Sequence, residues 1–290
     1  MLNSNAANFA SHKTRFVAVT IPSINNANFA ETLTALTRGL ADSGLQVLLG
    51  YTNYAMQEEE RLVEQLLQRR PEAIVVTGSS HTERCRRLLE KAAIPVIEMW
   101  DIPNRPIDAF VGFSNAAAAS LMVDHFHSLG LTRLAFIGGD TDRDTRGLDR
   151  RFGFIKRLEE LHLGTERMVS AGVPPITVRD GAASIQQLLQ RWPDTEAVMC
   201  VSDLAAFGAI NYCLRNTIAV PKRIAIAGFG DYDISDVANP SITTIDAKAA
   251  LIGELTARKI LQRLELVASK DDATSIVVPE LLKRESTAIK

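Results

Sequence analysis

Short apolar runs alternate with longer amphipathic runs along most of the chain, and this alternation constrains the fold more than any other feature. The first apolar run, residues 16–21, leads through a turn-rich loop into a helical pattern over 29–40. The same order recurs over 45–129, and a second series starts at the apolar run 133–137. The alternation predicts an α/β fold of two doubly wound parallel-sheet lobes, with helices on both faces of each sheet.

The predicted boundaries follow the apolar runs and the residues that end helices. The predicted strands are 16–21, 45–51, 73–76, 96–99, 109–113, 133–137, 197–201, 224–228, 241–245 and 276–282. The predicted helices are 29–40, 57–69, 83–91, 115–129, 151–161, 181–190, 203–214 and 249–266, and Asn28, Asn115 and Asp203 could cap helices.

Composition sets limits on the class of protein. With 290 residues and 46% hydrophobic content, the chain can build two cores. Its 32 Lys and Arg nearly balance 34 Asp and Glu, so no overall basic field attracts nucleic acid. No apolar run approaches the ~18 residues of a membrane span, so no membrane partner is expected. Cys85, Cys200 and Cys213 lack CxxC spacing, and we expect reduced core thiols in a cytoplasmic protein.

The motifs of common enzyme classes are missing. No GxGxxG, GxSxG, P-loop or HExxH sequence is present, so we expect no enzyme activity, no catalytic residues and no cofactor. His125 and His127 stand two apart on a predicted helix, where their side chains diverge, so no metal site is expected.

Polar and aromatic residues instead follow the predicted strands, where open parallel sheets bind ligands. Each one alone is at least as well explained as a solvated loop residue or a helix cap. Together they predict a cleft between the two lobes that holds a small ligand. A guanidinium suits a sugar acid, and an aromatic ring suits the apolar face of a sugar. The candidate residues are Ser23, Asn28, Phe29, Trp100, Arg143, Arg150, Ser202, Asp203 and Asp231.

Several segments resemble the LacI/GalR family of transcription regulators, over about residues 3–284. The matching segments are Val17-Ala18-Val19-Thr20-Ile21-Pro22-Ser23, Asn28-Phe29-Ala30-Glu31, Leu129-Gly130, Ile137-Gly138-Gly139, Arg150-Arg151-Phe152-Gly153-Phe154, Val201-Ser202-Asp203, Ala206-Phe207-Gly208-Ala209, Ile226-Ala227-Gly228-Phe229 and Pro240-Ser241-Ile242-Thr243-Thr244-Ile245.

The resemblance implies lobes of the periplasmic-binding-protein type I joined by three chain crossings. The implied division is 1–14 for the end of a DNA-binding hinge, 15–113 plus 246–270 for the N-terminal lobe, and 114–245 plus 271–290 for the C-terminal lobe.

The resemblance also implies roles for the candidate residues. Arg150 would grip the effector, Ser202 and Asp203 would contact it from the C-terminal lobe, and Asp231 would hydrogen-bond its hydroxyls. Asn28, Phe29 and Trp100 would line the wall of the N-terminal lobe. Gly230 precedes Asp231, whereas many members have an acid directly after the Gly-aromatic pair.

The segments Trp100-Asp101, 111–115 and 228–231 are most similar to the gluconate-operon repressor branch. They imply a sugar or sugar acid such as gluconate as effector, in a homodimeric repressor.

Family members begin with a helix-turn-helix, which we do not find in this chain, so operator DNA is an expected partner only with that missing segment. Asn5, Ala6 and Phe9 resemble the end of the family's hinge helix. The alternatives are a periplasmic sugar-binding protein of a transporter and, from another class, a sugar-acid enzyme on an α/β scaffold.

Overall fold

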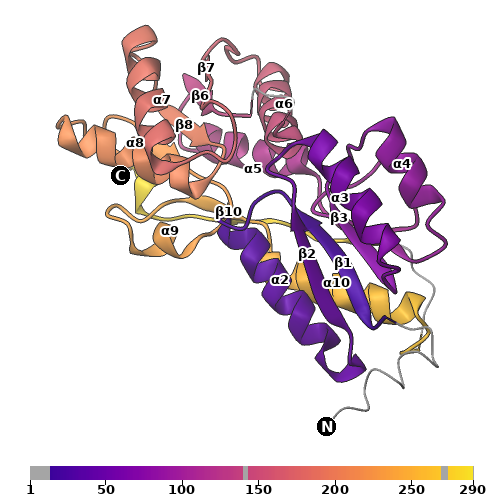
Figure 1. Cartoon of the computed structure of the whole chain (residues 1–290). Coiled ribbons are helices and arrows are strands. Elements are labelled where there is room, and N and C mark those ends of the chain that lie inside the picture. Colours follow the sequence, from indigo (N-terminus) through magenta and orange to yellow (C-terminus); the bar gives the residue numbers. More distant parts are fainter. Residues whose placement is uncertain (1–13, 140–142, 269–273, 290) are drawn as a thin grey trace. The chain divides into compact units, whose positions relative to one another are not determined.

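The structure is a computed structural model that describes residues 14–139, 143–268 and 274–289 (Figure 1). The chain forms two compact units, Met1–Gly112 with Ala249–Val277 (unit 1) and Phe113–Lys248 with Val278–Lys290 (unit 2). The predicted hinge residues Asn5, Ala6 and Phe9 lie outside the described residues. None of the helices in the described ranges is long and apolar enough to cross a membrane.

Unit 1 contains one six-stranded sheet in which every pairing is parallel, in the order β11-β5-β4-β3-β1-β2. Its elements are β1 (Phe16–Ile21), α2 (Ala27–Leu40), η1 (Ala41–Ser43), β2 (Gln46–Tyr51), α3 (Met56–Gln68), β3 (Ala73–Thr77), α4 (Glu83–Glu90), β4 (Val96–Met99), β5 (Ala109–Gly112), α10 (Ala249–Arg263) and β11 (Thr274–Ile276).

Helices cover both faces of this sheet. Ala18 and Ile74 belong to a core cluster with Val63 of α3 and Leu89 of α4. The alternate residues of the same strands, such as Val19, are also fully buried, so the opposite face is covered too. The helices α2 and α10 pack against each other, as do α3 and α4.

Unit 2 contains a four-stranded parallel sheet, in the order β7-β6-β8-β9, and an antiparallel pair, β10 with β12. Its elements are α5 (Asn115–Ser128), β6 (Leu134–Ile137), α6 (Thr145–Glu160), β7 (Met168–Val169), α7 (Val178–Arg191), β8 (Ala197–Cys200), α8 (Asp203–Arg215), β9 (Ala225–Ala227), α9 (Asp233–Val237), β10 (Thr244–Asp246), β12 (Glu280–Leu282) and η2 (Glu285–Thr287).

The structure corrects the predicted C-terminal strand. Residues 276–282 do not form one strand, because β11 pairs with β5 in unit 1 whereas β12 pairs with β10 in unit 2. Unit 1 therefore extends to Val277 rather than to residue 270. The short elements β7 and α9 were not predicted.

The start of α6 also differs from its prediction. This helix begins at Thr145 rather than at Arg151, because the Asp144 side chain accepts a hydrogen bond from the Gly147 N–H and caps it. The earlier start puts Arg150 inside the helix.

A glycine lets α6 lie close to α5. A Cβ added at Gly153 would lie 2.2 Å from the carbonyl oxygen of Ala116, so no side chain fits between the two backbones. On the sheet side, Phe154 of α6 packs against Phe136 of β6, with ring centroids 5.3 Å apart. The position of α6 therefore depends on the backbone contact between Gly153 and Ala116.

We expect Gly153→Ala to destabilise unit 2, because the methyl group must push α6 away from α5. Overpacking of this kind costs about 1–3 kcal/mol. Urea unfolding followed by circular dichroism measures the loss. Gly50→Ala is the control, since its added Cβ would meet Leu62 at 3.4 Å, an ordinary contact. Equal stabilities of the two variants would contradict the account.

Candidate functional site

Arg150 is held in place by two residues of unit 2. Its Nη1 donates a hydrogen bond to Asn115 Oδ1 at 2.7 Å, and its guanidinium carbon lies 4.3 Å from the centroid of the Phe229 ring. Phe229 in turn stacks with Phe113, with centroids 6.1 Å apart and planes at 29°. A guanidinium held by a hydrogen bond and a cation–π contact loses less rotamer freedom when it binds an anion.

Neither Asn115 nor Phe229 was predicted as a site residue. Asn115 was expected to cap α5, but Ser114 does so, since its hydroxyl accepts from the Ala117 N–H at 3.1 Å. The amide of Asn115 is therefore turned to Arg150. Phe229 follows the short strand β9, which ends at Ala227.

Asp203 is completely buried at the start of α8. Its two carboxylate oxygens accept from the Tyr232 N–H at 2.8 Å and from the Thr244 hydroxyl at 2.6 Å. Gly228 lies so close that an added Cβ would be 2.0 Å from Asp203 Oδ1. Asp203 thus fixes the loop after β9, and its contact with an effector stays a prediction.

Burial raises the pKa of Asp203 to about 7. The bonds from Thr244 and Tyr232 act in the opposite direction, the nearby Asp231 carboxylate adds to the rise, and Arg284 lowers it. The adjacent Ser202 is the helix cap, because its hydroxyl accepts from the Ala205 N–H. The prediction that Asp203 caps α8 is therefore wrong, because Ser202 is the cap.

Asp231 is in an ion pair. Arg284 Nη2 donates to Asp231 Oδ1 at 2.7 Å, and the Ser235 hydroxyl donates to the same oxygen at 3.2 Å. The backbone of Asp231 has φ +56°, a left-handed conformation that directs the chain into α9. Arg284 was missed, because it is 53 residues away in the sequence.

In unit 1, Phe29 and Trp100 form an aromatic pair. Their ring centroids lie 5.3 Å apart with an interplanar angle of 78°, and both side chains are buried. The φ of Trp100 is +75°, so its backbone is strained where it leaves β4. Asn28 is buried beside Phe29. It was predicted as a cap, but Asn26 caps α2 by accepting a hydrogen bond from the Asn28 N–H.

The two remaining candidates differ in exposure. Ser23 is buried after β1, and its hydroxyl accepts from the Asn25 N–H at 3.2 Å. Arg143 is exposed in the loop before α6, whereas Arg146, which was not selected, is buried in the first turns of that helix. Periodicity could not separate these two arginines, because the start of α6 was misplaced.

Comparisons with known proteins define the family. A family model for the periplasmic binding protein-like domain matches residues 123–287. The HTH-type transcriptional regulator GntR of Pseudomonas aeruginosa is 34% identical over 287 residues, covering 98% of this chain and 82% of that protein.

Solved structures agree with this relationship. A LacI family transcriptional regulator from Silicibacter pomeroyi is 39% identical with a TM-score of 0.89, covering 95% of this chain and 100% of that one. The transcription regulator GntR from Chromobacterium violaceum is 31% identical with a TM-score of 0.87, covering 94% and 99%. These findings establish the periplasmic-binding-protein type I fold.

The chain belongs to the LacI/GalR family of transcription regulators, near the regulators named GntR. It comprises their effector-binding core and is not an enzyme. The relatives do not favour a sugar-binding protein of a transporter.

The raised pKa of Asp203 predicts how the stability of the fold depends on pH. Its pKa is raised on folding, so the folded state holds the proton more tightly, and stability falls as pH rises from about 4 to about 7. Asp203→Asn removes this dependence while its amide can still bond Tyr232 and Thr244. Over that pH range, we expect the free energy of unfolding of wild type to fall by up to about 4 kcal/mol relative to that of the variant.

Urea unfolding at several pH values from 4 to 8 measures this difference. Asp233→Asn, an exposed carboxylate at the start of α9, is the control. Parallel stability curves for wild type and Asp203→Asn would rule out the raised pKa.

Proposed function

We propose that this chain is the effector-sensing and dimerising core of a repressor, and that its effector is a sugar acid such as gluconate. The observation that carries the proposal is Arg150, held between Asn115 and Phe229. A guanidinium presents a planar fork of donors that matches the two oxygens of a carboxylate. Restraint by Asn115 and Phe229 favours such paired bonds over a loose ion pair.

The other candidates would bind the remainder of the effector. Phe29 and Trp100 would line the wall of unit 1 against the carbon chain of a sugar acid. Ser23, Asn28, Arg143, Ser202 and Asp231 supply polar groups for its hydroxyls. Asp203 would contact the effector as well, and its two oxygens also accept hydrogen bonds within unit 2.

Effector binding would control DNA through a shift between two conformations of a homodimer. In a cytoplasmic regulator with a helix-turn-helix, the effector favours one conformation and thereby changes the affinity for operator DNA. Such coupling amounts to about 1–3 kcal/mol and is reciprocal, so DNA changes effector affinity by the same factor. Asn5, Ala6 and Phe9 would belong to the hinge that joins the effector-binding core to the helix-turn-helix.

Isothermal titration calorimetry with gluconate, other sugar acids and neutral sugars tests the proposal. We expect saturable binding of a sugar acid, weakened about 10- to 100-fold in Arg150→Ala, because a charge-assisted hydrogen bond contributes about 1.5–3 kcal/mol. Arg157→Ala is the matched control, since Arg157 is on the same helix but pairs with Asp124 and Glu160.

The contrary outcomes are distinct. Binding of a neutral sugar with equal affinity to wild type and Arg150→Ala would reject the sugar-acid assignment. Equal losses in Arg150→Ala and Arg157→Ala would show a general effect on α6 rather than a ligand contact.

A further inference from the structure

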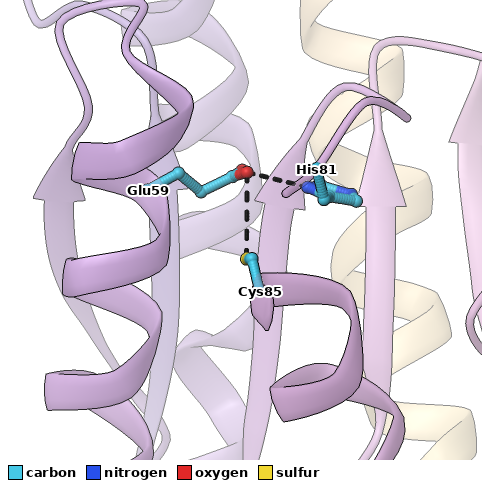
Figure 2. A group of neighbouring side chains, drawn as sticks. All are labelled: Glu59, His81 and Cys85. Carbon is cyan, nitrogen blue, oxygen red and sulfur yellow. Dashed lines mark hydrogen bonds and ion pairs between the residues drawn. The ribbon is translucent and has the colours of Figure 1, made fainter. Parts of the chain in front are cut away.

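Three side chains with different metal-binding atoms meet inside unit 1. They are Glu59 of α3, His81 in the loop after β3 and Cys85 of α4 (Figure 2). The carboxylate, imidazole and thiol atoms all lie within 4.8 Å of one another. His81 Nδ1 is 2.8 Å from Glu59 Oε2, and Cys85 Sγ is 4.0 Å from the same oxygen. The cluster lies away from the effector residues in the sequence and uses none of them.

The cluster is buried, which separates it from an ordinary surface group of acids. The side chains of His81 and Glu59 are 1% and 7% exposed, and Cys85 is fully buried. Tetrahedral zinc with bonds of ~2.0 Å to nitrogen or oxygen and ~2.3 Å to sulfur separates its ligand atoms by about 3.3–3.6 Å. Shifts of about 1 Å would therefore bring the three atoms to these distances.

A second carboxylate supports the imidazole from its other side. His81 Nε2 lies 3.5 Å from Glu98 Oε1, and the Glu98 side chain is 1% exposed. The other oxygen of Glu98 accepts from the Ile107 N–H at 2.8 Å, which fixes the carboxylate on β4. Histidines that bind metals through one nitrogen commonly donate the other N–H to such a carboxylate.

The 3.5 Å contact between His81 Nε2 and Glu98 Oε1 is an ion pair that is long for a hydrogen bond, and neither buried atom makes a better-formed hydrogen bond among the described residues. A ligand on Nδ1 that displaces its proton would leave Nε2–H as the only donor of the ring, directed at Glu98.

We propose that Glu59, His81 and Cys85 form a binding site for a divalent transition-metal ion, with zinc as the best match, and that Glu98 orients His81. The mixed oxygen, nitrogen and sulfur set suits zinc, whereas calcium and magnesium prefer oxygen ligands alone. Water or the second oxygen of Glu59 completes four-coordination. The metal would tie α3 and α4 to the ends of β3 and β4.

The charges of the proposed ligands match a divalent cation. The carboxylate of Glu59 and a thiolate on Cys85 would together balance the two positive charges of the ion, so no unpaired charge would be added to the core.

Cobalt(II), which takes zinc sites and absorbs visible light, tests the proposal. The full chain is unfolded, then refolded with one equivalent of cobalt(II), because a buried site needs opening before metal enters. We expect one ion per chain, a thiolate-to-cobalt charge-transfer band and displacement by zinc. Cys85→Ala should lose the band, whereas Cys213→Ala, which removes a buried thiol of unit 2, should keep it.

Two further variants make the test independent of folding failure in Cys85→Ala. Glu59→Gln should lose one ligand, and Glu98→Gln should weaken binding about 10- to 100-fold while keeping the band. No bound cobalt in refolded wild type would overturn the proposal, as would an equal band in wild type and Cys85→Ala.

Discussion

Contact between the backbones of α5 and α6 determines where Arg150 can lie. Gly153 allows α6 to approach Ala116 of α5, and Arg150 is one turn before this contact on the same helix. The guanidinium thereby reaches Asn115 at the start of α5 and the face of Phe229. A wider helix pair would separate Arg150 from Asn115.

A buried carboxylate organises the neighbouring loop in a comparable way. Asp203 receives hydrogen bonds from Tyr232 and Thr244, so the loop between β9 and β10 is fastened to the start of α8. Phe229 is part of this loop, and its carbonyl oxygen accepts from the Asp203 N–H at 3.1 Å. Burial of the Asp203 carboxylate raises its pKa and costs desolvation free energy. The same buried contacts hold Phe229 against the guanidinium of Arg150.

The sequence predicted the elements with strong periodicity and failed where local signals were ambiguous. Apolar runs located the central strands, whereas the two-residue strand β7 carries too little pattern to detect. Ser114 and Asn115 are both good caps, so the sequence could not tell which one turns to Arg150. The pair of Asp231 with Arg284, and the meeting of Glu59, His81 and Cys85, depend on tertiary packing. Arg150 itself was predicted from a family motif.

A double-mutant cycle of Asn115→Ala and Arg150→Ala, read out as sugar-acid affinity by calorimetry, tests the central claim that Asn115 acts through Arg150. We expect Asn115→Ala to weaken binding in wild type by about 3- to 10-fold and to have little further effect in Arg150→Ala, a coupling of about 1 kcal/mol. The same loss from Asn115→Ala in both backgrounds would contradict it, because Asn115 would then act independently of the guanidinium.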